Sequence, residues 1–197
     1  MEYISSYLSE RMVVEGIISE KNKTYYEYSI QGLIEKMIVV ILIFSFAVIL
    51  HRLVEVASFL LIFASIRKYS DGVHCRTSLG CFCASVAVTL STILIVEVFP
   101  MCCAMWIGGV VSAMVVLCKI ATIPHPELNL TEVETEYLKS RSRIVSFISG
   151  TLIVVLLLIP SVRYIASYMA LGVIYNALGL MILKSIGRWD LYEKKEN

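Results

Sequence analysis

Apolar segments follow one another almost without interruption between residues 37 and 183 of this chain. Hydrophobic residues make up 58% of the sequence and charged residues only 17%, which leaves too few polar side chains to cover a water-soluble domain. A helix needs about 20 apolar residues to cross the hydrocarbon layer of a bilayer. We therefore expect an all-α, polytopic integral membrane protein embedded in a lipid bilayer.

Short polar or proline-containing breaks divide the apolar region into six predicted spans. The first two are short, so either they form a hairpin in a thinned membrane or the first helix begins near Ile30. Pro100 and Pro160 mark tight connections after the third and fifth spans, because proline lacks the N–H that a helix interior needs. The predicted spans are residues 37–50, 53–66, 78–96, 101–121, 144–159 and 162–183.

Lysine and arginine fall almost entirely on one side of this six-span arrangement. Basic residues in short loops resist translocation and so mark the cytoplasmic side. Of the 17 basic residues, only Arg52 and Arg163 lie on the other side. The distribution predicts that both termini are cytoplasmic. The basic residues on the cytoplasmic side are Arg11, Lys21, Lys23, Lys36, Arg67, Lys68, Arg76, Lys119, Lys139, Arg141, Arg143, Lys184, Arg188, Lys194 and Lys195.

Three segments lie outside the spans. Residues 1–36 carry apolar residues at helical spacing, which predicts an amphipathic helix along the inner interface, and no removable signal peptide is expected. The cytoplasmic loop of residues 122–143 is acidic first and basic last, which suits a short helix capped by Thr131. Residues 184–197 form a predicted cytoplasmic tail, so the membrane domain covers residues 37–183.

Charge and cysteine content exclude several kinds of function. The net charge of +1 provides no field that would attract nucleic acid. None of the six cysteines falls into paired CxxC motifs at metal-site spacing, so we expect free thiols, no metal and no organic cofactor. We interpret Cys102, Cys103 and Cys118 as small packing residues.

The predicted cytoplasmic loop of residues 67–81 reads RKYSDGVHCRTSLGC and is followed by FC. A thiol protease needs a thiolate nucleophile and an imidazole that takes its proton. His74 could serve as the base, with Cys81 or Cys83 as the nucleophile. One straight helix would separate His74 from Cys81 by about 10 Å along its axis. We therefore expect residues 71–78 to bend, and Cys81 to lie in the first turns of the third span, where the helix dipole favours a thiolate.

This loop resembles the core of the AgrB family of quorum-sensing peptide processors, in which a basic strip, a glycine and a histidine precede a cysteine seven residues after that histidine. His74 and Cys81 match the family's two catalytic positions. The segment IPHPELNL also resembles a proline-containing loop of the family. The chain departs from the pattern at Asp71, where a second glycine is common, and at Cys75, where a small residue is common. These departures affect the shape of the loop more than its chemistry.

The resemblance implies a multi-pass cell-membrane protein of a Gram-positive bacterium that cuts a small, AgrD-like precursor peptide. Such a precursor carries an acidic C-terminal tail, which Arg67, Lys68 and Arg76 could bind by charge-assisted contacts. The basic character of cytoplasmic loops explains the same residues without a substrate. The resemblance implies removal of the tail through an acyl-enzyme thioester and release of a cyclic thiolactone or lactone. No spacing rule assigns a third catalytic group.

Two other classes of function fit the hydropathy. One is a peptide exporter or transporter without proteolytic activity, and the other is a non-catalytic scaffold, although neither explains the clustering of His74 with cysteines. The family resemblance also favours a homodimer. Small residues on the fourth span would allow close helix approach between or within subunits, namely Gly108, Gly109, Ser112 and Ala113.

Overall fold

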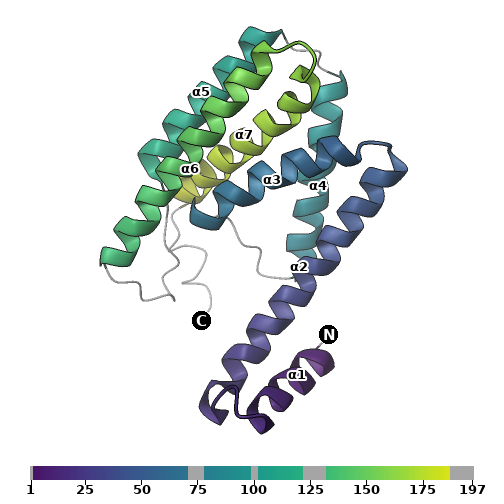
Figure 1. Ribbon diagram of the computed structural model, residues 1–197, viewed down its shortest axis with the longest axis vertical. Helices are drawn as coiled ribbons and strands as arrows, with labels where there is room; N and C mark the ends of the chain where they lie inside the picture. The colour runs from purple at the N-terminus through teal and green to yellow at the C-terminus, as the bar shows by residue number, and fades with distance from the viewer. Residues whose placement is uncertain (1, 71–77, 99–101, 122–131, 187–197) are drawn as a thin grey trace.

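The computed structural model describes residues 2–70, 78–98, 102–121 and 132–186, and all regular structure in these ranges is helical. Figure 1 shows a bundle of α3, α5, α6 and α7, with the hairpin of α1 and α2 extending to one side. The elements are α1 (Glu2–Val14), the 3-10 helix η1 (Glu20–Asn22), α2 (Lys23–Ile49), α3 (Leu53–Ser70), α4 (Ser78–Val98), α5 (Cys103–Ile120), α6 (Glu132–Leu158) and α7 (Arg163–Ile186).

Four of these helices are long and apolar enough to cross a membrane, by length and composition. The four segments are 20–49, 103–120, 132–158 and 163–185, and the shorter apolar segment 82–98 lies in α4. Helix α3 has 18 residues, with Glu55 in its first turn and Arg67 and Lys68 in its last turn. The all-α, polytopic membrane architecture predicted from the hydropathy is confirmed.

Two helices extend beyond the predicted spans. Helix α2 already begins at Lys23, which favours the longer first helix over a thinned hairpin, and the predicted boundary at residue 36 falls inside it. A helix begins directly after Thr131, as expected, but α6 runs from Glu132 to Leu158 without a break, so the prediction that this helix is short and separate from the fifth span is wrong. Neither α2 nor α6 contains proline, so both helices can continue into their polar turns. In α6, the Lys139 ammonium lies 2.9 Å from the Glu136 carboxylate and stabilises the exposed turns.

Helix α7 lies at the centre of the bundle. Of its most apolar stretch, 61% is buried within the protein, against 12% for α2. The most extensive helix contacts join α7 to α3 and α5, and α6 covers a further side. Buried side chains from all four helices form one apolar core, which includes Phe59, Ile66, Val110, Leu117, Ile153, Leu157, Tyr168, Val173 and Leu180.

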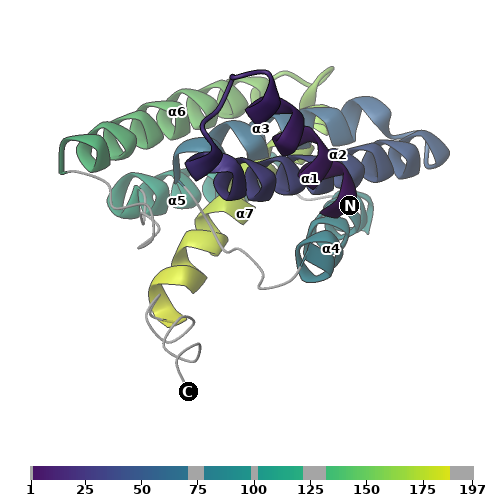
Figure 2. The same ribbon diagram turned by 90° about the horizontal axis from the view of Figure 1, so that it is seen from below.

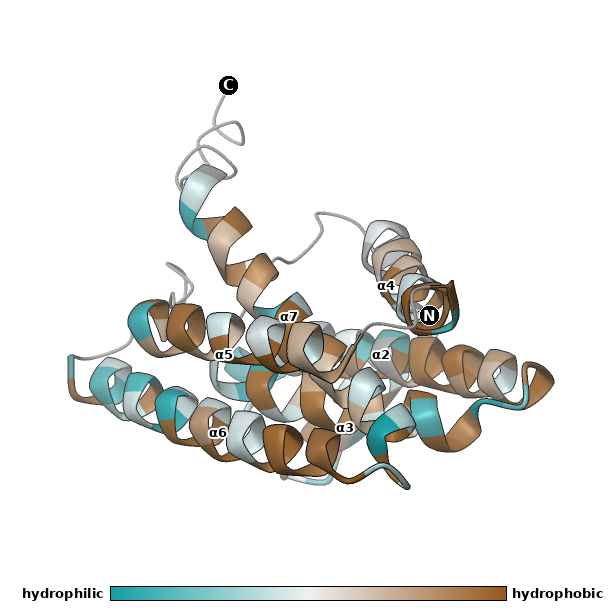
Figure 3. Ribbon diagram, turned by 90° about the horizontal axis from the view of Figure 1, so that it is seen from above, coloured by the Kyte–Doolittle hydropathy of each residue, from teal (hydrophilic) through white to brown (hydrophobic). Residues whose placement is uncertain are grey.

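Small and polar residues mark the interior as clearly as apolar ones do. Ser142, Ser146 and Ser149 are buried on α6, whereas large apolar side chains such as Phe46 and Ile49 are exposed on α2. Figure 3 shows apolar residues along much of the helices and polar residues at the start of α6. This distribution suits lipid, because lipid tails do not drive apolar side chains inward.

Polar side chains also connect the bundle helices by donating to backbone carbonyl oxygens. The Asn176 amide on α7 donates to the Phe63 carbonyl oxygen on α3 at 3.1 Å. The Ser142 hydroxyl on α6 donates to the carbonyl oxygen of Ala121, at the end of α5, at 2.7 Å. Such bonds fix the positions of helices along their axes, since an unpaired backbone group in lipid costs several kcal/mol (~2–7).

The small residues of α5 have different environments. A Cβ atom built on Gly109 would lie 3.2 Å from Ile174 of α7, and Ala113 is buried in the core. Gly109 and Ala113 therefore pack within one subunit. Gly108 and Ser112 are exposed.

Replacement of Gly172 by valine is expected to separate α7 from α3. A Cβ at Gly172 would lie 3.2 Å from the Phe59 backbone oxygen, whereas a Cβ at Gly179 on the same helix would have no such neighbour within 4 Å. Gly172→Val should lower the free energy of unfolding by about 1–3 kcal/mol. Gly179→Val should change it by less than ~0.5 kcal/mol. Unfolding of both variants in detergent tests the contact, and equal effects would contradict it.

Candidate functional site

The last turn of α3 presents two cations beside aromatic rings. The Arg67 guanidinium carbon lies 5.7 Å from the centroid of the Phe63 ring, and the Lys68 ammonium lies 5.5 Å from the centroid of the Tyr69 ring. Arg67 is half-buried and Lys68 is exposed. Cations are favourable at a helix C-terminus and over aromatic faces. The end of α3 is therefore an ordered, positively charged surface.

Cys81 occupies the first turn of the next helix, because α4 begins at Ser78. This confirms the expected backbone position of Cys81. The first N–H groups of a helix have no partner within it and carry a partial positive charge, which stabilises an anion such as a thiolate. The Cys81 side chain lies outside what the structure describes. Cys83 follows on another face of α4 as an exposed free thiol.

Residues 71–77 lie outside the described residues, and so do His74, Arg76 and the predicted bend. The pairing of His74 with Cys81 therefore stays a prediction, and so does contact between Arg76 and a substrate. His125 also lies outside the described residues. Within the described ranges, no group of three or more His, Cys, Asp or Glu side chains could hold a metal ion.

Three further described cysteines lie on or next to α5. Cys103 packs against the core and donates its Sγ hydrogen to the Leu157 carbonyl oxygen at 3.3 Å. Cys118 is half-buried near the end of α5. Cys102 is exposed beside the start of α5, so its interpretation as a packing residue is wrong. The loop position of Cys102, just before the first turn of α5, explains this exposure.

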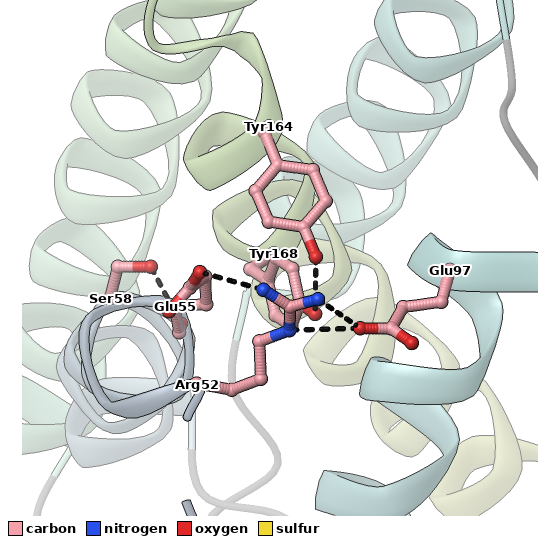
Figure 4. Close-up of polar contacts among 6 residues, drawn as sticks. All are labelled: Arg52, Glu55, Ser58, Glu97, Tyr164 and Tyr168. Atoms are coloured by element: carbon pink, nitrogen blue, oxygen red, sulfur yellow. Dashed lines mark hydrogen bonds and ion pairs between the residues drawn. The ribbon is translucent and has the colours of Figure 1, made fainter. Parts of the chain in front are cut away.

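A second polar cluster lies at the opposite ends of α3 and α4, where α7 begins (Figure 4). The Arg52 side chain donates from Nε to Glu97 Oε1 at 2.8 Å, and its Nη2 lies 2.7 Å from the same oxygen. Its Nη1 lies 3.7 Å from Glu55 Oε1. The guanidinium carbon lies 5.5 Å from the centroid of the Tyr164 ring, whose hydroxyl is 3.4 Å from that of the buried Tyr168.

Sequence reasoning did not predict this cluster. The sequence placed Arg52 only among the exceptions to the concentration of basic residues on the cytoplasmic side. The useful signal was that Arg52 had no assigned partner on its side, although Glu97 directly follows a predicted span on that same side. Charges at the end of an apolar helix usually have partners, so this pair could have been proposed.

The sequence model described as "Accessory gene regulator B" (AgrB) matches residues 1–183. The chain belongs to the AgrB family. No curated protein and no solved structure matches the chain. Membership of the AgrB family assigns this membrane protein to quorum-sensing peptide processing, with a precursor peptide as its partner.

Proposed function

We propose that this AgrB-family protein is a membrane-embedded cysteine endopeptidase whose nucleophile is Cys81 and whose base is His74. The observation that carries the proposal is the position of Cys81 in the first turn of α4, directly after the segment that contains His74. A helix N-terminus lowers the pKa of a thiol, and the thiolate is the reactive species. The basic end of α3 precedes the same segment and adds positive charge to this part of the chain.

The proposed reaction begins when His74 takes the proton of the Cys81 thiol. The thiolate attacks the carbonyl carbon before the acidic tail and gives a tetrahedral oxyanion. Backbone N–H groups at the start of α4 lie at the positive end of the helix dipole and are suitable donors to that oxyanion. Collapse of the intermediate breaks the C–N bond, and the departing amine of the tail takes the proton from the His74 imidazolium.

The acyl group then remains on Cys81 as a thioester, which preserves its reactivity. An internal Cys or Ser of the precursor attacks the thioester carbonyl and loses its proton, and Cys81 leaves as a thiolate. The product is a cyclic thiolactone or lactone. If water attacks instead, the product is a linear acid. Exclusion of water from the site would favour the cyclic product.

We also propose that α2 to α7 form six spans with both termini in the cytoplasm. Four of these helices are long and apolar enough by themselves, and α4 contains a further apolar segment. Six consecutive helices return the chain to the side on which it began. This arrangement leaves Arg52 and Arg163 as the exceptions to the concentration of basic residues on the cytoplasmic side.

Processing of a cognate precursor in reconstituted membranes tests the catalytic pair. Cys81→Ala should abolish the cleaved product, His74→Ala should slow its formation by about 10²–10⁴-fold, and Cys83→Ala should change it by less than about twofold. Mass spectrometry of the product supplies the readout, and a mass one water lower than that of the linear acid identifies cyclisation. Normal cleavage by folded Cys81→Ala would refute the mechanism and favour a role in export.

Thiol labelling tests the orientation, because Cys83 and Cys102 are both exposed, and Cys83 lies near the start of α4 whereas Cys102 lies beyond its end, just before α5. In variants that retain one of these two cysteines alone, a membrane-impermeant maleimide should label Cys102 in intact cells. It should label Cys83 only after the cells are made permeable. The reverse order of labelling would show that the termini face outward.

A direct role of Arg67 in binding the acidic tail predicts an effect on KM. Arg67→Gln should raise KM by about tenfold (~1.4 kcal/mol), and added salt should reduce the difference. Arg141→Gln is the matched control, because the Arg141 guanidinium carbon lies 5.1 Å from the centroid of the Tyr137 ring in a similar arrangement. For a precursor whose acidic tail residues are replaced by glutamine, KM should be the same with Arg67→Gln as with the unsubstituted protein. An unchanged KM for Arg67→Gln would leave the cation with a purely topological role.

A further inference from the structure

Helix α4 contacts the bundle less extensively than α3, α5 or α6 does. It lies against α2 and α7, and Figures 1 and 2 show it apart from α5 and α6. Among the side chains of α4 that the structure describes, those that pack against the core lie in the half nearer its C-terminus and include Val88, Ile93 and Val96. Because a helix is stiff, the anchoring of this C-terminal half also affects the position of Cys81 at the other end of α4.

Two side-chain interactions hold that C-terminal half to its neighbours. Near the middle of α4, the Ser91 and Tyr175 hydroxyls are 2.6 Å apart. At the end, Glu97 accepts the Arg52 guanidinium through two nitrogen atoms at 2.8 and 2.7 Å. The first interaction allows a helix to pivot about one point. The second, six residues further along, removes that freedom.

Arg52 is suited to act as a fixed support because groups from three elements surround it. Glu55 on α3, Glu97 on α4 and the Tyr164 ring on α7 all face its guanidinium group (Figure 4). The side chain of Arg52 is 35% exposed and that of Glu97 is 43% exposed. A partly exposed ion pair adds little stability, so its geometry is the more informative property.

We propose that Arg52 and Glu97 are positioning residues for Cys81, acting through α4 from the opposite end of the helix. Glu97 follows Cys81 by 16 residues, which corresponds to about 24 Å of helix. A helix between these points transmits rotation and axial displacement, and a misplacement of about 1 Å can slow a reaction by ~10²-fold. This inference rests on the proposed function of Cys81, since it concerns the placement of that nucleophile.

Glu55 offers a matched control within the same cluster. It approaches Arg52 from α3, three residues further along the chain, and therefore does not connect Arg52 to α4. Glu55→Gln and Glu97→Gln remove the same charge from the same guanidinium group, yet only Glu97→Gln removes a link to the helix of Cys81. Different effects of the two variants would separate positioning from the general charge balance of the cluster.

The test is the kinetics of precursor cleavage by the full chain in lipid nanodiscs. Glu97→Gln and Arg52→Gln should each lower kcat by about 10–100-fold, while KM and the unfolding temperature stay near the values of the unsubstituted protein. Glu55→Gln should stay within about twofold of the unsubstituted kcat. The exchanged pair, Arg52→Glu with Glu97→Arg, should recover most of the lost kcat.

Three results would count against the proposal in distinguishable ways. An unchanged kcat for Glu97→Gln, with Cys81→Ala inactive, would overturn the positioning role and leave the proposed peptidase intact. A fall in kcat that parallels a fall in unfolding temperature, without recovery in the exchanged pair, would assign the ion pair to stability alone. Activity of folded Cys81→Ala would overturn the proposed function itself.

Discussion

The need to satisfy every backbone N–H and C=O group without water determines the rest of this structure. In lipid, only helices and closed barrels meet that need, so the apolar region consists of helices. The same constraint concentrates polar chemistry at helix ends, where the first N–H and last C=O groups lack partners. Ser142 supplies one such partner at the end of α5, and the Arg163 Nε does the same for Leu157 at the end of α6.

Because lipid tails resemble an apolar core, the hydrophobic effect does not select which helix face is inside. Close packing and buried polar contacts make that selection instead. Gly172 allows α7 to approach the backbone of α3, and Asn176, one turn later, donates to the Phe63 carbonyl oxygen of α3. These residues give α7 its central position. Helix α2 has few such contacts and exposes most of its apolar side chains.

Much of this organisation could be predicted from hydropathy, because helix formation in lipid depends on local sequence. The helix around Cys81 was predicted to begin just before that residue, and α4 does begin at Ser78. The start of α2 was misplaced and α6 was divided into a short helix and a span, since the polar first turns of both helices are helical but not apolar. The pairing of Arg52 with Glu97 depends on how α3, α4 and α7 assemble, which hydropathy does not show, and the sequence pointed to it only through two charges beside apolar spans on the same side.

The limited contact of α4 fits the proposed task of the helix that carries Cys81. A nucleophile buried between packed helices would be closed to a peptide, whereas the exposed thiol of Cys83 shows that the first turns of α4 remain accessible. Accessibility usually reduces positional precision, because fewer neighbours restrain the side chain. Restraint of α4 through Tyr175 and Arg52 resolves this conflict. In this proposal, the two contacts fix the C-terminal half of α4, far from the substrate. A precursor then approaches the other end of the helix, where the Cys83 thiol is exposed.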